Sequence, residues 1–134
     1  MRWTEQIIAA HKNSLAQRPA DRRSTLIAHW EQYRTDGTSK PAVEMALELA
    51  EQGNANEVEL GFYVLRDLAP TDPSLHCHVS ELAKHKSAKV RRNLAFYLSR
   101  ELPPELSKSV FAELLRDKAA SVRIRAIETI GMRD

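Results

Sequence analysis

The chain has little of several features that define other classes of protein. Among its 134 residues there is one cysteine, Cys77, so it cannot form an internal disulfide, and a reducing compartment fits best. No apolar run approaches the roughly 18–20 residues that a membrane-spanning helix needs, and the N-terminal segment lacks the apolar core of a secretory signal. We therefore expect a cytoplasmic protein that does not bind a membrane.

Glycine is also scarce, with four residues, and no apolar–polar alternation flanked by turn residues is present. This pattern argues against strands and predicts an all-α fold. Apolar residues recur at helical spacing in eight segments, joined by connections so short that consecutive helices must be antiparallel neighbours. The segments are 3–17, 21–37, 41–53, about 58–68, 72–83, 88–102, 104–115 and 119–130.

Several residues mark where these helices begin and end. Asp21 is a good N-cap for the second helix, and Gly37 ends it. Asp72 followed by Pro73 gives the clearest start, for the fifth helix. In the last helix, we expect the buried stripe to consist of Val122, Ala126, Ile127 and Ile130.

The chain contains an internal repeat. The run Gly61–Pro70 returns 34 positions later as Ala95–Pro104, and Leu82, Val90 and Arg91 match residues 32 positions further on, at Leu114, Val122 and Arg123. Repeats of 20–50 residues are typical of units that cannot bury their apolar face alone and therefore stack into a solenoid.

The repeated segments resemble a known family. The segment Asp117-Lys118-Ala119-Ala120-Ser121-Val122-Arg123 is similar to the signature of HEAT repeats, and residues 86–95 repeat it with His85 or Lys86 in place of the Asp. The resemblance implies a right-handed α-α superhelix, a HEAT-like solenoid of about eight antiparallel helices in a single domain, residues 1–134. Residues 1–36 form an atypical first pair, and residues 40–134 form three HEAT-like pairs. It also implies that Asp117, Arg91 and Arg123 tie neighbouring repeats together, and that the second helices line a concave surface.

Charge is distributed unevenly along the chain, although the net charge is only +2. Residues 1–75 contain eight Lys and Arg against eleven Asp and Glu, whereas residues 76–134 contain twelve against seven. An anionic partner should therefore bind the second half. Apart from Arg133, the basic residues there are Lys84, Lys86, Lys89, Arg91, Arg92, Arg100, Lys108, Arg116, Lys118, Arg123 and Arg125.

Two functions follow from the resemblance and the charge. Family members mostly act as scaffolds and adaptors, so we expect a non-catalytic module that presents its concave face to a protein partner, without a cofactor. The alternative is a nucleic-acid-binding protein, since one HEAT-like group excises alkylated bases from DNA in a basic cleft with a catalytic Asp. For either partner we expect the binding residues to be Tyr63, Lys89, Arg92, Phe96, Arg100 and Arg125.

Two further patterns have a structural interpretation beside a functional one. In His76-Cys77-His78, adjacent residues point about 100° apart on a helix, so we expect a buried cysteine between two half-exposed histidines and no metal site.

The pairs Phe62-Tyr63 and Phe96-Tyr97 occupy equivalent repeat positions. One ring of each should face the core, and the other could join an aromatic ladder along the groove.

The last helix has apolar residues on more than one side. Ile124 lies about 200° around the helix from Val122, so it cannot join the buried stripe. We expect this C-terminal helix to be an association surface, either for self-pairing or for docking onto a larger partner. The alternative is that the stems of Arg123, Arg125 and Arg133 screen it.

Overall fold

The computed structural model describes residues 2–15, 21–97 and 102–131 and confirms the all-α prediction. Within these residues the chain forms helices and no strand. Each predicted segment is a helix, and the bounds differ by a few residues from the expected ones. The helices are α1 (Arg2–Leu15), α2 (Arg22–Asp36), α3 (Lys40–Gln52), α4 (Ala55–Leu68), α5 (Leu75–Ala83), α6 (Ala88–Tyr97), α7 (Pro104–Leu114) and α8 (Ala120–Gly131).

Both ends of α2 use the predicted chemistry. Asp21 caps α2 by accepting a hydrogen bond from the backbone N–H of Arg23, and Gly37 ends it in the left-handed region at φ 81°. α4 begins with a reciprocal capping box that we did not predict. The Asn54 side chain accepts from the N–H of Glu57 at 3.0 Å, and the Glu57 carboxylate accepts from the N–H of Asn54 at 2.9 Å.

The predicted start of α5 is wrong by a few residues. Asp72 and Pro73 lie in a tight turn, in which the N–H of Leu75 donates to the carbonyl of Asp72 at 3.0 Å, and the regular helix begins at Leu75. The Asp72 carboxylate does accept from the N–H of Ser74. It therefore caps the turn before the helix, and an i→i+3 turn of this kind is common at helix starts.

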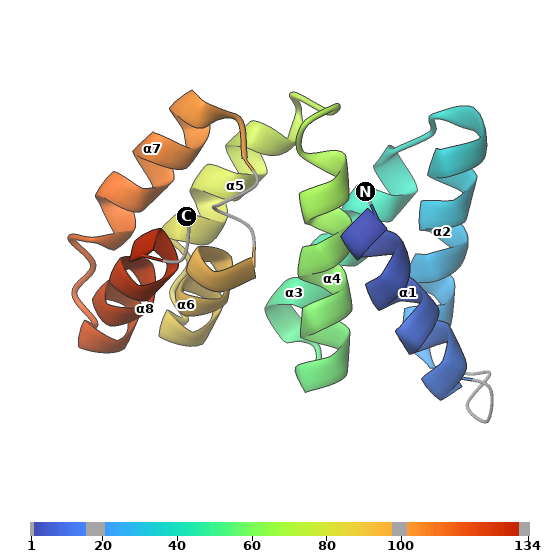
Figure 1. The fold of residues 1–134 in the computed structure, drawn as a ribbon, viewed down its shortest axis with the longest axis horizontal. Helices are drawn as coiled ribbons and strands as arrows, with labels where there is room; N and C mark the ends of the chain where they lie inside the picture. Colours follow the sequence, from blue (N-terminus) through green and yellow to red (C-terminus); the bar gives the residue numbers. More distant parts are fainter. Residues whose placement is uncertain (1, 16–20, 98–101, 132–134) are drawn as a thin grey trace. The chain divides into compact units, whose positions relative to one another are not determined.

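The chain divides into two compact units, residues 1–68 and 69–134, which we describe separately. In the first unit α4 packs against α1, α2 and α3, while α2 also contacts α3 (Figure 1). α4 is accordingly buried on most of its surface. The buried Trp30 indole N–H donates to the Asp67 carboxylate at 2.8 Å and so ties α2 to α4.

The closest helix contact in the first unit is between α3 and α4. Ala42, Ala46 and Ala50 form a small-residue stripe on α3, and each is buried. Opposite them, Gly61 of α4 lies so close that a Cβ atom there would sit 2.7 Å from the Ala46 carbonyl oxygen. The two backbones can approach this closely only because position 61 has no side chain.

The second unit has the pair-on-pair stacking that the repeat predicts. α5 lies beside α7, and α6 beside α8, with α6 and α8 running in the same direction (Figure 1). Val90 and Val122, which the 32-residue offset makes equivalent, are both buried, as predicted. Leu98, which the sequence places on the inward face of the sixth helix, lies outside the described residues.

The prediction for the buried face of α8 is partly wrong. Val122 and Ala126 are buried, but Ile127 is 60% and Ile130 39% exposed, and the third buried residue is Thr129. Residues 122, 126 and 129 follow an i, i+4, i+7 stripe, and Thr129 tolerates burial because its hydroxyl donates to the Arg125 carbonyl at 2.8 Å. Hydrophobicity alone therefore selected two residues, Ile127 and Ile130, that lie outside the buried stripe.

Replacing Gly61 with alanine should destabilise the first unit. The added methyl group would meet the backbone of α3, which can move only with its helix, so we expect the free energy of unfolding to fall by about 1–3 kcal/mol. Urea denaturation followed by circular dichroism measures this. The matched control is Gly131→Ala, where a Cβ atom meets nothing within 4 Å and stability should stay the same or rise slightly. Equal stabilities for the two variants would contradict the α3–α4 packing.

Candidate functional site

Four of the six predicted binding residues lie on α6 and α8, outside the buried stripes of these helices. Lys89, Arg92 and Phe96 follow one another at i, i+3 and i+7 on α6, and Arg125 lies on the adjacent α8. The buried face of α6 consists of Val90, Arg91, Leu94 and Ala95. We call the surface formed by Lys89, Arg92, Phe96, Arg125 and Glu128 the α6–α8 surface.

Contacts between the two helices hold the side chains of the α6–α8 surface in place. The Arg125 guanidinium carbon lies 5.0 Å from the centroid of the Phe96 ring, a cation–π contact across the two helices. Arg92 donates to the Ser121 hydroxyl at 3.4 Å. Within α8, Glu128 Oε1 lies 3.7 Å from Arg125 Nη1. The Tyr97 ring packs edge-on against the neighbouring Phe96 ring, with the ring centroids 4.8 Å apart.

Beneath this surface, a buried ion pair joins the two helix pairs of the second unit. Arg91 of α6 donates to both carboxylate oxygens of Asp117, at 2.7 and 3.1 Å, and the two side chains are 5% and 7% exposed. Arg91 and Asp117 thus tie the two helix pairs together, as expected, whereas the hydrogen bond of Arg123 lies within its own pair. A bidentate pair of this kind fixes both distance and orientation.

The same backbone contact occurs in both helix pairs. Arg91 Nη1 donates to the His85 carbonyl at 2.6 Å, and Arg123 Nη1 donates to the Asp117 carbonyl at 2.7 Å. The side chains of His85 and Asp117 each cap their turn by accepting from the N–H two residues further on, at 3.0 and 2.9 Å. His85 therefore occupies the position of the Asp, and Lys86 does not.

The environment of Asp117 favours its charged form. Burial by itself opposes ionisation, but the hydrogen bonds from Arg91 and from the N–H of Ala119 outweigh it and hold the pKa of Asp117 below its usual value. The carboxylate is therefore ionised and fully engaged. A group held this way is a poor candidate for a catalytic acid or base.

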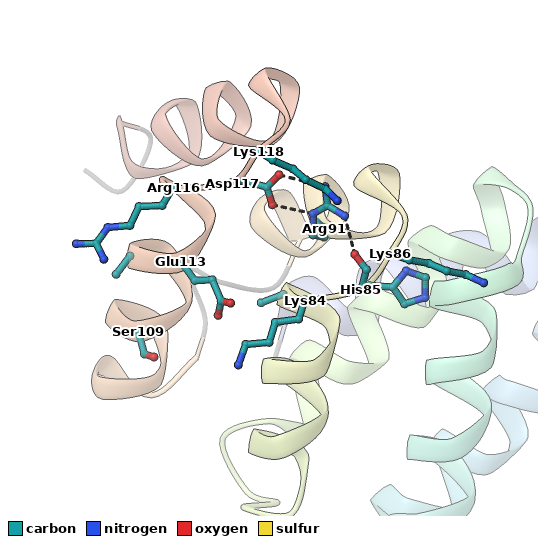
Figure 2. Close-up of a pocket in the computed structure, with 11 residues that line it drawn as sticks. Lys84, His85, Lys86, Arg91, Ser109, Glu113, Arg116, Asp117 and Lys118 are labelled. Atoms are coloured by element: carbon teal, nitrogen blue, oxygen red, sulfur yellow. Dashed lines mark hydrogen bonds and ion pairs between the residues drawn. The ribbon is translucent and has the colours of Figure 1, made fainter.

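An open cleft of about 650 Å³ lies where α5 and α7 end, and Figure 2 shows its lining residues. The Arg91–Asp117 pair lies at one side of the cleft, and Lys84 and Glu113 extend from α5 and α7 on the other side. The remaining charged side chains diverge. Arg116 points away from α5, and Lys86 points toward the opposite side of the view (Figure 2). Five of the predicted basic residues therefore line the cleft, and their side chains do not converge on one point: Lys84, Lys86, Arg91, Arg116 and Lys118.

The other two predicted binding residues are Tyr63 and Arg100. Tyr63 belongs to α4 in the first unit, where Arg66 lies over its ring at 5.6 Å and burial raises the pKa of its hydroxyl group. Arg100 lies outside the described residues. Phe62 is fully buried, as expected for one ring of its pair, whereas the equivalent Phe96 is 39% exposed.

The cysteine prediction is wrong in one respect. Cys77 is exposed, not buried, because the inward face of α5 is occupied by Leu75, Val79, Leu82 and Ala83. Residue 77 lies about 200° around the helix from both Leu75 and Val79, on the opposite side. Within the described residues, no group of three or more His, Cys, Asp or Glu side chains is placed to hold a metal ion.

Comparison with known proteins gave no assignment. No family model, no curated protein and no solved structure matches the chain. None of the described helices has the length and apolar character to cross a membrane. The functional argument therefore depends on the geometry of the second unit.

Two arrangements were missed by sequence reasoning. The Phe96–Arg125 contact could have been found from the 32-residue offset, which maps Arg125 onto position 93, one helical turn before Phe96. A buried cluster in the first unit had no such signal. There, Arg23 Nη1 donates to His11 Nδ1 at 2.9 Å, and His11 Nε2 must then carry the proton that it shares with Glu59 at 2.8 Å.

Replacing Asp117 with asparagine should lower the free energy of unfolding by about 3–5 kcal/mol at neutral pH, because the buried Arg91 charge loses its partner. The wild-type pair should contribute its full stability above about pH 4 and lose it as pH falls through the lowered pKa of Asp117. Asp117→Asn should therefore lose less stability than wild type between about pH 5 and pH 2. Denaturant titrations across this range measure both effects.

The control is Glu113→Gln, a change in a carboxylate that lines the same cleft without bonding to Arg91. It should leave the stability at neutral pH close to that of wild type. An equal loss in the two variants would show that the ion pair does not hold the helix pairs together.

Proposed function

We propose that the chain is a non-catalytic protein-binding module, built as a HEAT-like α-solenoid, and that its α6–α8 surface binds an acidic segment of a protein partner. The solenoid part of the proposal is supported by the second unit, where equivalent arginines make equivalent backbone contacts and Val90 and Val122 are equally buried. The binding part is supported by the side chains of the α6–α8 surface.

The observation that carries the proposal is the Arg125–Phe96 contact. Arginine and aromatic residues are enriched among the residues that dominate binding energy at protein interfaces. Here the two are held together at 5.0 Å before any partner arrives, which lowers the entropy lost on binding. Lys89 and Arg92 extend the positive charge along α6, so the complementary segment is acidic with an apolar residue to cover Phe96.

One feature favours a protein over a nucleic acid. Base stacking needs an open aromatic face, but Arg125 lies over the Phe96 ring and Tyr97 packs against it. The carboxylate of Glu128 lies 3.7 Å from the Arg125 guanidinium, so the surface carries both signs of charge. A surface that combines charged side chains with an aromatic ring suits a polypeptide, whose different side chains can pair with each of these groups.

Base excision, the enzymatic form of the alternative, has less support. A glycosylase would need a free carboxylate in its basic groove, and Asp117 is already held by two hydrogen bonds from Arg91. Non-enzymatic nucleic-acid binding retains one supporting observation. Lys84, Lys86 and Lys118 lie around the cleft next to the start of α6 and α8.

Binding of a fluorescent peptide of alternating glutamate and leucine tests the proposal. We expect Arg125→Gln and Phe96→Ala each to weaken binding by about tenfold or more, as is usual for central interface residues. Fluorescence anisotropy on the full chain measures the affinity. Lys108→Gln, in a groove lined by α7 and α8 and outside the α6–α8 surface, is the charge control and should change the affinity less than about twofold.

The same assay with a DNA duplex and a single-stranded RNA separates the alternatives. Tight nucleic-acid binding that falls steeply with salt, depends on Lys84, Lys86 and Lys118, and ignores Phe96→Ala would favour the nucleic-acid function. Peptide binding that neither Arg125→Gln nor Phe96→Ala weakens would remove the α6–α8 surface from consideration.

A further inference from the structure

The end of the second unit formed by α7 and α8 carries an exposed apolar face. Ile127 is 60%, Ile130 39% and Leu115 38% exposed. A groove of about 500 Å³ runs between the two helices there, lined by Pro104, Glu105, Lys108, Phe111, Ala112, Leu115 and Ile130. We call these groove residues, together with Arg123 and Ile127, the end face.

The equivalent positions of the preceding helix pair are covered. The 32-residue offset maps Leu115 onto Ala83 and Ile127 onto Ala95, and these two alanines are 3% and 0% exposed. α7 and α8 pack beside α5 and α6 in the same unit. The end face is therefore the counterpart of a surface on which a further helix pair stacks.

Arg123 lies in the same position on α8 as Arg91 on α6. Both donate Nη1 to the backbone carbonyl six residues earlier. Arg91 uses Nε and Nη2 to hold the Asp117 carboxylate of the next pair, whereas Nε and Nη2 of Arg123 have no partner among the described residues. Arg123 thus offers a planar pair of donors that matches a carboxylate.

The charges beside the end face argue against a second copy of this chain. Lys108 and Arg123 belong to it, and Glu105 is the one carboxylate among the residues that line the groove. Arg116, just after α7, points away from α5 (Figure 2). Two-fold pairing would place this surface against itself and bring like charges together. The complementary partner is apolar at its centre and carries negative charge.

We propose that the end face docks an α-helical hairpin of a partner protein, which stacks on α7 and α8 as these stack on α5 and α6. The turn between the two helices of the partner places a carboxylate on Arg123, and its apolar residues cover Ile127, Ile130 and Leu115. This interaction uses a different surface from the α6–α8 surface and does not depend on the function proposed for it.

A display library of two-helix hairpins with a randomised turn, selected against the full chain, tests the proposal. We expect Asp or Glu to be enriched in the turn of the selected hairpins. Binding should fall by about tenfold or more in Arg123→Gln and in Ile127→Glu, because each removes a central contact of the end face. Ile127 is exposed, so its replacement leaves the core intact.

Two variants make the result specific. Arg123→Lys keeps the charge but loses the paired donors, so its binding should also be weaker than that of wild type. Arg92→Gln changes the α6–α8 surface instead and should alter hairpin binding less than about twofold. Hairpins without acidic turns, or hairpins that bind Arg123→Gln and Ile127→Glu as well as wild type, would overturn the proposal.

Sedimentation distinguishes the second copy from the heterologous partner. We expect the wild type to remain a monomer at high micromolar concentration. A dimer that dissociates in Ile127→Glu would assign the end face to self-pairing and overturn the proposed partner.

Discussion

The Arg91–Asp117 ion pair is the contact on which the architecture of the second unit depends. The Arg91 guanidinium donates hydrogen bonds to two turns at the same time: to the His85 carbonyl in its own helix pair, and to the Asp117 carboxylate in the next pair. Asp117 in turn caps the start of α8 by accepting from the N–H of Ala119. One guanidinium therefore fixes where α8 begins and how it lies against α6.

In the first unit, an arginine and a carboxylate also link two helix pairs, but the positions of the two charges are exchanged. The 34-residue offset maps Arg91 onto Glu57, which lies in the first turn of α4. Glu57 closes the capping box with Asn54 and receives two hydrogen bonds from Arg22 at 3.0 Å, which hold the pKa of the carboxyl group below its usual range. The repeat thus preserves an Arg–carboxylate link near the start of α4 and of α6. The residue at the equivalent position differs, since it is Glu57 in α4 and Arg91 in α6.

Helix existence could be predicted from the sequence because it depends on local chemistry. Asp21 and Gly37 mark helix ends through their own side-chain and backbone preferences, and the structure uses both of them. The buried side of α8 could not be predicted, because the positions of α6 and α7 decide that Thr129 is buried and Ile127 is exposed. The exposure of Phe96 beside the burial of Phe62 has the same origin, since equivalent residues meet different neighbours in different repeats.

The candidate site could be predicted in part for a related reason. Lys89, Arg92, Phe96 and Arg125 were identified from charge and repeat position, but their grouping on one surface depends on the packing of α6 against α8. Tyr63, chosen by the same repeat argument, belongs to the other unit.

The Arg125–Phe96 contact crosses the junction between two helix pairs, and this has a thermodynamic consequence. Repeat units can open one junction at a time, with a free energy set by the contacts between neighbours. A partner that contacts Arg125 and Phe96 at the same time binds only when the two helix pairs are packed together. Its binding free energy therefore adds to the free energy needed to separate them. Occupancy of the α6–α8 surface would therefore be visible as slower amide hydrogen exchange in α7 and α8, far beyond the residues that the partner touches.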